Sequence, residues 1–288
     1  MDGILNIHKP LTLTSHDVVG RVRRVAGQKR VGHSGTLDPL ATGVLVVCLG
    51  RATRLVEYVV GQRKEYEAVI RLGQSTATYD AEGEITAERP LPADLTADQL
   101  AITLRQFTGA IEQRPPMYSA IKKDGQPLYK MARRGETIEI PARPVTIYDL
   151  AILGWEVPLL TVRVACSAGT YIRSLAHDLG EVLGCGGHLV GLVRTAVGPF
   201  SLETAVALDA LTPENIAQFL LPSETAVAHL PALELEDAAV KALFMGQLVP
   251  CQPHHPTAEL VRVTNPNHPF AGLATREGEI WRPKKMFD

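Results

Sequence analysis

Apolar residues recur at two spacings along the chain, and each spacing predicts a different kind of element. Residues 15–26 carry valines three and four positions apart with arginines opposite, which predicts an amphipathic helix. Residues 64–72 alternate instead, which predicts a strand with Tyr66 on its apolar face. The uninterrupted apolar run at 44–49 predicts a buried strand. The sequence therefore predicts a fold that mixes α and β elements.

Turn residues indicate how the chain is organised. From about residue 225 onward, short strand-like runs are separated by Pro, Asn and Gly, which predicts a small β-rich domain after a larger one. Within the larger part, residues 114–135 carry two prolines, an Asp-Gly turn and several basic residues. A long basic segment of weak periodicity inside a compact protein is more often functional than filler. We therefore expect residues 114–135 to be a functional segment.

Composition excludes several classes of protein. With 288 residues, 45% of them hydrophobic, the chain can bury the core of one large domain or of a large and a small one. No apolar run has the length of a membrane span, and the N-terminus lacks the pattern of a signal peptide. The four cysteines form no CxxC pair, and Cys251, His254 and His255 lack a second ligand pair at zinc-finger spacing. We therefore expect a cytoplasmic protein with reduced thiols, no metal and no membrane contact.

Charge is distributed unevenly, although the formal net charge is only −2. Residues 201–240 hold seven acidic residues and no Lys or Arg, so the rest of the chain is net positive. A run of charge is more often a solvated face than a binding site, so basic clusters permit RNA binding without establishing it. The candidate contacts to an RNA backbone are Arg21, Arg24, Lys29 and Arg30 in one cluster, and Lys122, Lys123, Lys130, Arg133 and Arg134 in another.

One loop concentrates groups that could do chemistry. The segment VGHSGTLDPLATGVL, residues 31–45, places Asp38 before a proline, among glycines, hydroxyls and His33, and directly ahead of the predicted buried strand. An isolated Asp-Pro pair is most often a turn. The surplus of hydrogen-bonding groups and the rigid strand behind the loop favour a carboxylate held for reaction, because precise sites are built on rigid elements. On the residues of the loop alone, both interpretations stay open.

Two more residues could complete a site with Asp38. Tyr66 belongs either to the core or, through its hydroxyl, to the wall of a cleft. Arg173 lies off the apolar stripe of a predicted helix at 170–183, and its alternative role is that of an exposed arginine. The sequence contains no Walker loop, GxSxG elbow, HExxH or GxGxxG, which leaves little support for nucleotide hydrolysis, serine hydrolase or dehydrogenase chemistry. We therefore expect catalysis here to use no cofactor.

The chain resembles the tRNA pseudouridine synthase B family in several long, ordered motifs that together cover essentially all of it. The motifs are DGILNIHKPLTLTSHDVV, GHSGTLDPLATGVL, KEYEAVIRLG, RPPMYSAIKKDGQPLYKMARRG, CSAGTYIRSLAHDLGEVLGCGGHLVGLVR and GLATREGEIWRPKKMF. The resemblance implies an α+β pseudouridine synthase fold over residues 1–222, with a mixed, largely antiparallel central sheet and flanking helices. It also implies a thumb-like RNA-binding insert at 114–140 and a PUA-like RNA-binding domain at 223–288.

The resemblance further implies an activity and a partner. It predicts an isomerase that converts uridine-55 in the T-loop of tRNA into pseudouridine, after the uridine is flipped out, without guide RNA or cofactor. It also predicts a monomer with no protein partner. A guide-RNA-dependent relative is one alternative, which the thumb-like insert and the lack of a long basic tail disfavour. A non-catalytic RNA-binding or tRNA-folding module is another. The intact Asp38, Tyr66 and Arg173 argue against it, although a folding role alongside catalysis stays open.

The resemblance assigns roles residue by residue. It implies Asp38, Tyr66 and Arg173 as catalytic residues, with Arg173 paired to the aspartate, and Tyr66, His33, Lys64, Tyr171 and Leu192 as contacts to the flipped base. The sequence departs from the family at Ser34, where threonine is usual, and at His8, where an acidic residue often precedes Lys-Pro. Asp38 can attack the sugar carbon or abstract a sugar proton, and the sequence does not choose between these routes.

Overall fold

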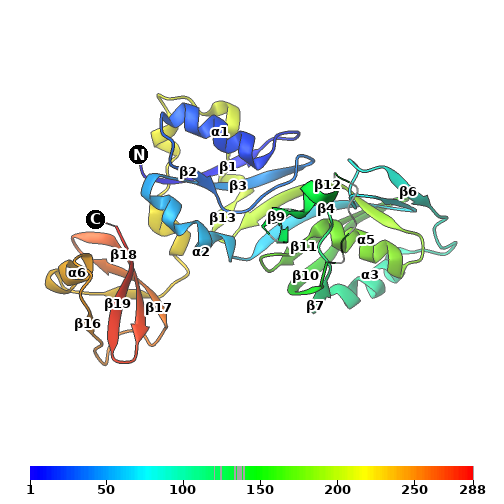
Figure 1. The fold of residues 1–288 in the computed structure, drawn as a ribbon. Helices are drawn as coiled ribbons and strands as arrows, with labels where there is room; N and C mark the ends of the chain where they lie inside the picture. Colours follow the sequence, from blue (N-terminus) through cyan, green and yellow to red (C-terminus); the bar gives the residue numbers. More distant parts are fainter. Residues whose placement is uncertain (120, 124, 133, 135–137, 139, 288) are drawn as a thin grey trace.

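The chain folds into one large β-sheet with flanking helices and a smaller sheet at the C-terminal end (Figure 1). The computed structural model describes residues 1–119, 121–123, 125–132, 134, 138 and 140–287. Of Lys122, Lys123, Pro127, Tyr129 and Lys130 it describes the backbone alone. Within these residues, none of the helices is long and apolar enough to cross a membrane.

The large sheet is mixed and largely antiparallel, which confirms the expected fold class. In spatial order its main path is β14 (Val206–Ala207), β1 (Gly3–Lys9), β3 (Ala41–Leu49), β12 (Gly187–Val197), β4 (Lys64–Leu72), β11 (Leu159–Cys166), β10 (Arg143–Glu156) and β7 (Gly109–Gln113), while β2 (Val31–His33) pairs with β3 and β13 (Phe200–Ser201) with β12. Two pairs, β1 with β14 and β3 with β12, are parallel. The parallel β3–β12 pair joins the two halves of the sheet.

Helices and short two-stranded ribbons complete this part of the fold. They are α1 (Ser15–Ala26), η1 (Gly50–Leu55), α2 (Val56–Val60), β5 (Gln74–Thr76), β6 (Ile85–Glu88), α3 (Ala97–Leu104), η2 (Arg105–Phe107), β8 (Lys122–Lys123), β9 (Gln126–Pro127), α4 (Leu128–Ala132), α5 (Ile172–Val182), η3 (Leu202–Thr204), η4 (Leu208–Ala210), η5 (Ile216–Phe219) and η6 (Ser223–Val227). Figure 1 shows α1 beside β1, β2 and β3, and α3 and α5 beside β10 and β11. The helices thus cover the two halves of the sheet separately.

The helix α1 has the bounds that its sequence predicts, because local interactions set both ends. Thr14 caps it through a reciprocal box, in which the Thr14 hydroxyl accepts from the backbone N–H of Asp17 at 3.1 Å and the Asp17 carboxylate accepts from the backbone N–H of Thr14 at 2.9 Å. Gly27 ends it in the left-handed region, with φ 60°. Val18 and Val22 are fully buried against β1 and β3.

The predicted strands at 44–49 and 64–72 are confirmed as parts of β3 and as β4. All of residues 44–49 are buried, since β3 lies between β1 and β12. In β4 the side chains alternate, and Tyr66, Ala68 and Ile70 enter a core shared with α5, β11 and β12. The same core receives Leu192 of β12. Tyr66 is therefore held on a central strand of a rigid sheet.

The C-terminal part is a second sheet, as the turn spacing predicts. Its strands in spatial order are β15 (Ala232–Glu234), β17 (Leu260–Asn265), β18 (His268–Glu277), β19 (Ile280–Met286) and β16 (Val249–Pro250), with α6 (Asp237–Phe244) packed on it. Trp281 is fully buried in this core and donates through its indole N–H to Nδ1 of His255 at 3.0 Å.

The end of the chain packs against η1 and α2 of the large part. Arg54 donates to the backbone carbonyl of Met286 at 2.6 Å and lies over the ring of Phe287. Lys285 donates to the carbonyl of Arg54 at 2.5 Å and pairs with Glu57. Because η6 also packs against α2, the domain boundary expected between residues 222 and 223 stays a prediction.

Candidate active site

The Asp38 loop connects β2 to β3 and is fixed by backbone hydrogen bonds on both sides. The side-chain hydroxyl of Ser15, in the first turn of α1, accepts from the backbone N–H of Leu37 at 2.8 Å and donates to the backbone carbonyl of Leu37 at 3.1 Å. The carbonyl of Asp38 accepts from the N–H of Ala41 at 3.0 Å, and that of Pro39 accepts from Thr12 at 2.9 Å. Because α1 and β3 are themselves packed in the core, the loop holds the Asp38 side chain in a defined place.

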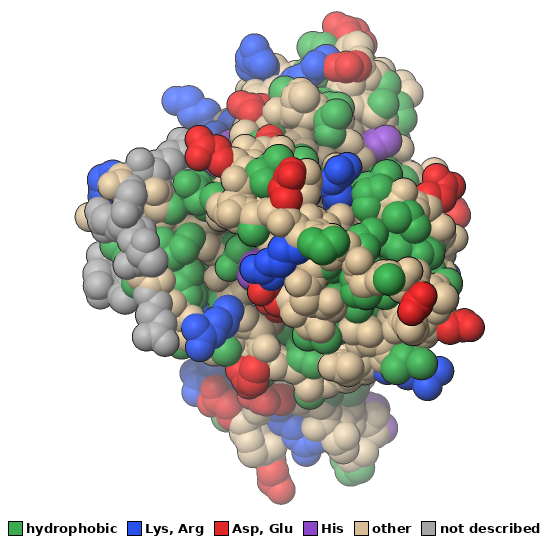
Figure 2. Space-filling view, turned by 90° about the vertical axis from the view of Figure 1, so that its right-hand side faces the viewer, with side chains coloured by type: hydrophobic (Ala, Val, Ile, Leu, Met, Phe, Trp, Pro, Cys, Tyr) green, Lys and Arg blue, Asp and Glu red, His purple; other side chains and the backbone are tan. Residues whose placement is uncertain are grey.

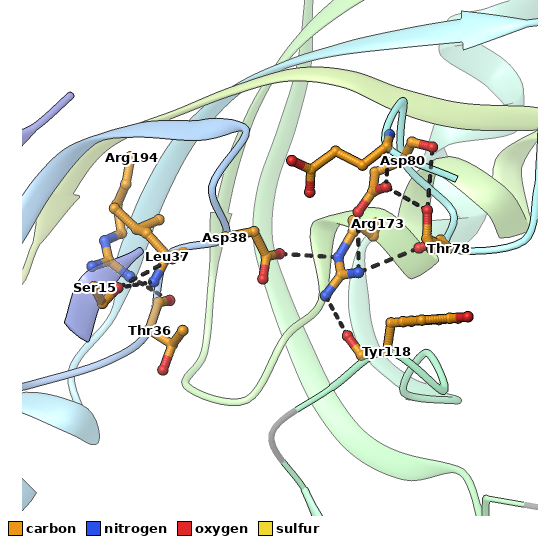
Figure 3. A network of polar contacts seen from close by, with 10 residues as sticks. Ser15, Thr36, Leu37, Asp38, Thr78, Asp80, Tyr118, Arg173 and Arg194 are labelled. Atoms are coloured by element: carbon orange, nitrogen blue, oxygen red, sulfur yellow. Dashed lines mark hydrogen bonds and ion pairs between the residues drawn. The ribbon is translucent and has the colours of Figure 1, made fainter. Parts of the chain in front are cut away.

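Arg173 lies in the first turn of α5 and makes four contacts that join separate segments (Figure 3). Its Nε pairs with Oδ2 of Asp38 at 3.0 Å, and its Nη1 pairs with Oδ2 of Asp80 at 3.1 Å. Nη1 also donates to the carbonyl of Thr78 at 3.3 Å, and Nη2 to that of Tyr118 at 2.8 Å. One guanidinium therefore connects the Asp38 loop, the loop after β5 and the segment after β7.

Asp80 is the member of this network that sequence reasoning missed. Its side chain is 3% exposed, and besides Arg173 it accepts from the hydroxyl of Thr78 and from the N–H of Glu82 at 3.1 Å. A backbone bridge to Leu189 of β12 brings Asp80 to the site. An Asp two residues after a Thr and shortly before a Gly has the signature of a surface turn, so the sequence alone carried no signal for a buried ion pair.

Burial and charge act in opposite directions on Asp38. Burial raises the pKa of the Asp38 carboxyl above its ordinary value, and the charge of Asp80 adds to this, whereas Arg173 and Lys9 lower it. The net effect is a raised pKa. The ion pair with Arg173 nonetheless favours the carboxylate form, which either proposed route of reaction requires. The carboxyl is about one third exposed, so a substrate can reach it.

Tyr66 and Leu192 lie together in the core that also holds Leu37 of the Asp38 loop. Burial raises the pKa of the Tyr66 hydroxyl, while Arg194 opposes this and Asp38 adds to it. Tyr66 thus stays protonated at neutral pH and can act as a neutral hydrogen-bonding group. Tyr66 is 6% and Leu192 8% exposed, and their expected contact to the flipped base stays a prediction.

His33 and Tyr171 lie near Asp38 and Arg173 in the chain, at the end of β2 and just before α5. His33 ends β2 and lies edge-on to His16, with 6.0 Å between ring centroids, and burial lowers the pKa of its imidazole. Within the part of the chain that the structure describes, the buried Nδ1 of His33 has no hydrogen-bond partner. Tyr171 precedes α5, and the Gln113 side-chain amide holds its backbone N–H and carbonyl at 2.8 and 3.0 Å.

Lys64, whose expected contact to the base stays a prediction, lies at the start of β4. Its ammonium donates to the carbonyls of Val60 and Gln62, both at 2.7 Å, and so closes the end of α2. Burial lowers the pKa of Lys64 to about 8. Among the described residues, Lys64 has no contact with Asp38. The two carbonyls at the end of α2 satisfy its buried ammonium.

The two basic clusters differ in how much of them the structure describes. In the first, Arg21 pairs with Asp209 of the acidic 201–240 segment, and Arg30 donates to the Thr53 hydroxyl at 2.9 Å, while Arg24 and Lys29 are exposed. In the second, Arg134 is exposed and donates to Gln126 at 2.9 Å. Arg133 and the side chains of Lys122, Lys123 and Lys130 lie outside the described residues.

Basic side chains do not gather on every face. Figure 2, which shows the side of the molecule at the right of Figure 1, has Lys and Arg scattered among Asp and Glu. Among the described residues, no group of three or more His, Cys, Asp or Glu could hold a metal ion.

Comparison with known proteins identifies the family. A family model described as the N-terminal domain of TruB family pseudouridylate synthases matches residues 23–172, which include Asp38 and Tyr66. The chain belongs to the TruB family. Models for the tRNA pseudouridylate synthase B C-terminal domain and for the C-terminal part of pseudouridine synthase II TruB match residues 173–228 and 231–287. The family is one of pseudouridine synthases, so this TruB family member is an enzyme.

Relatives of this TruB family member match it over nearly its full length. The tRNA pseudouridine synthase B of Dehalococcoides mccartyi strain CBDB1 is 46% identical, over 100% of this chain and 97% of the relative. That of Pseudomonas aeruginosa strain UCBPP-PA14 is 45% identical, over 99% of this chain and 96% of the relative. A chain in a crystal structure of a Cbf5–Nop10–Gar1 complex matches with a TM-score of 0.77 at 29% identity, covering 99% of this chain and 85% of that one.

Proposed function

We propose that this enzyme converts uridine-55 in the T-loop of tRNA into pseudouridine, without a guide RNA, using Asp38 as the reacting carboxylate. The observation that carries the proposal is the Asp38–Arg173 ion pair beside Tyr66 and Leu192. The relatives named tRNA pseudouridine synthase B, at 43–46% identity over nearly the whole chain, support tRNA as the substrate.

The reaction rearranges bonds within one nucleotide. Isomerisation breaks the bond between N1 of uracil and C1′ of the ribose, turns the base, and joins C5 to C1′, while one proton leaves C5 and one reaches N1. No electrons are gained or lost overall, so the chemistry calls for a carboxylate, a pocket for the base and a route for a proton. Asp38 would supply the first of these, and Tyr66 and Leu192, which share one core, would line the second.

The base must leave its stack before Asp38 can reach the sugar. Enzymes that act on a base in structured nucleic acid extrude the nucleotide into a pocket and hold it by stacking and hydrogen bonds. Tyr66 and Leu192 would form the apolar wall, with His33 and Tyr171 at its edges. In this arrangement Asp38 either attacks C1′ or abstracts a proton from the sugar, and both routes start from the ionised carboxylate that Arg173 favours.

We further propose that several segments bind the rest of the tRNA. The segment 114–140, which contains β8, β9 and α4, would act as a thumb on the RNA hairpin, and its base is joined to the site through the carbonyl of Tyr118. The five-stranded C-terminal sheet would act as a PUA-like RNA-binding domain. Exposed Arg24, Lys29 and Arg134 are candidate phosphate contacts. We propose a cytoplasmic enzyme that works as a monomer without a protein partner.

The test uses the protein alone with an unmodified tRNA transcript, followed by mapping of pseudouridine. We expect one pseudouridine, at position 55, in the absence of any other RNA, and none in a transcript with cytidine at that position. Asp38→Asn should form no product and still bind the tRNA with a Kd within about threefold of the wild type, because it keeps the shape of the side chain. Product at position 55 from Asp38→Asn, or a requirement for a second RNA, would contradict the proposal.

A further inference from the structure

Arg194, in β12, is a buried cation next to the site that the reaction as described does not use. Its side chain is 1% exposed, and its guanidinium donates to three backbone carbonyls, of which that of Thr36 is drawn in Figure 3. Arg194 also lowers the pKa of the Tyr66 hydroxyl. Nε reaches the carbonyl of Val44 at 2.7 Å, Nη2 that of Gly35 at 3.2 Å and Nη1 that of Thr36 at 3.5 Å. Among the described residues, no carboxylate lies within ion-pair distance of Arg194.

These three carbonyls lie on both sides of Asp38. Gly35 and Thr36 precede it in the loop after β2, and Val44 follows it in β3. The guanidinium of Arg194 therefore binds the chain both before and after Asp38, at the start of the loop and in β3. A guanidinium carries its donors in a fixed fork, so it fixes the relative positions of the acceptors that it binds, as a flexible ammonium does not.

Arg194 also lies where the strands of the site meet. In the sheet it is the register partner of Tyr66 in β4 on one side and of Gly43 in β3 on the other. At Gly43, whose φ is 100°, a Cβ atom would lie 2.2 Å from the backbone oxygen of Arg194. Only a glycine allows β3 to approach β12 this closely, and that approach brings the guanidinium under the Asp38 loop.

Burying the charge of Arg194 without a counter-ion costs folding free energy, so the fold must offset that cost. Taking a guanidinium out of water without a counter-ion is unfavourable unless each N–H finds a strong acceptor. Here the acceptors belong to the loop that carries Asp38, and a hydrophobic residue would leave those carbonyls unpaired. Arg173 contacts the Asp38 carboxylate, whereas Arg194 contacts the backbone that carries it.

We propose that Arg194 is a positioning residue of the reaction, which holds the Asp38 loop so that the carboxylate stays aligned between Arg173 and the base pocket beside Tyr66. The inference rests on the proposed function of Asp38. It implies that loss of Arg194 slows the chemical step and leaves tRNA binding unchanged, since Arg194 is buried and out of reach of RNA. A misplacement of a reacting group by about 1 Å can lower a rate about 100-fold.

The experiment compares Arg194→Met and Arg194→Lys with the wild type in single-turnover assays on the tRNA transcript. Met keeps the length of the side chain without donors, and Lys keeps the charge but not the fork. Each variant is assayed at a temperature at which circular dichroism shows it to be folded, and its Kd for the tRNA is measured by filter binding. Ile216→Ala, which opens a cavity beneath η5 in the acidic 201–240 segment, is the control for lost stability alone.

We expect the single-turnover rate constant to fall about 100-fold in Arg194→Met and more than tenfold in Arg194→Lys, with a Kd within about twofold of the wild type. Ile216→Ala should lower the melting temperature and keep the rate. A rate within threefold of the wild type in either folded Arg194 variant overturns the proposal. So does an equal loss of rate in Ile216→Ala. Asp38→Asn, assayed in parallel, separates the two proposals, because its activity would refute the role of Asp38 itself.

Discussion

Replacing Arg173 by Met removes one cation from between two carboxylates, and the structure allows the consequence to be estimated. Arg173 and Asp80 are 7% and 3% exposed and 3.1 Å apart, so the variant leaves a buried carboxylate without its counter-ion. Breaking a buried pair in this way costs about 3–5 kcal/mol of unfolding free energy. Asp38 is about one third exposed, so water screens its ion pair with Arg173. Most of the lost unfolding free energy therefore comes from the buried pair of Arg173 with Asp80.

The loss of unfolding free energy in Arg173→Met should depend on pH, and the pKa of Asp38 decides whether it grows or shrinks as the pH rises. Its folded-state pKa is already raised by burial, and Arg173 lowers it, so Arg173→Met raises it further. A carboxyl whose pKa is higher in the folded than in the unfolded state holds its proton more tightly when folded. Stability is therefore lost as the pH rises from the unfolded-state pKa through the folded-state pKa. The difference in stability between wild type and variant is therefore larger at about pH 7.5 than at about pH 5.

Urea unfolding at both pH values measures this difference. The control is Arg163→Met, because Arg163 pairs with Asp149 at 3.3 Å while both side chains are about half exposed. We expect the control to lose less than about 1 kcal/mol at either pH. A loss below about 1 kcal/mol in Arg173→Met, or one that grows as the pH falls, would refute the reasoning.

Two further predictions concern the chemical step and the RNA. Asp80→Asn should move the acid limb of the single-turnover rate to lower pH, because the charge of Asp80 raises the pKa of Asp38. A limb that stays in place or moves up would show that Asp80 acts otherwise. Binding of tRNA should weaken with salt, by roughly 40-fold between about 50 and about 200 mM if about three phosphates are contacted. A Kd that is insensitive to salt in filter binding would argue against the basic residues as phosphate contacts.

The site shows how far sequence reasoning reaches. The residues alone raised Asp38, Tyr66 and Arg173 as candidates, and the resemblance to a family gave them roles. The structure puts Asp38 and Arg173 in contact and Tyr66 in the adjoining core. Neither argument found Asp80 or Arg194. Lys64 donates to two backbone carbonyls at the end of α2, which the sequence did not indicate, and its contact to the base stays a prediction.

What the sequence by itself determined depends on contacts between near neighbours. The helix α1 is set by a cap and a glycine at its ends, and β4 by the alternation of its side chains, both of which act within a few residues. What only the tertiary structure decided depends on the order of strands in the sheet. Asp80 meets Arg173 across 93 residues, and Arg194 meets Gly35 across 159. No local pattern records such pairs, because the free energy that selects them comes from packing the whole sheet rather than from the segments that carry the two side chains.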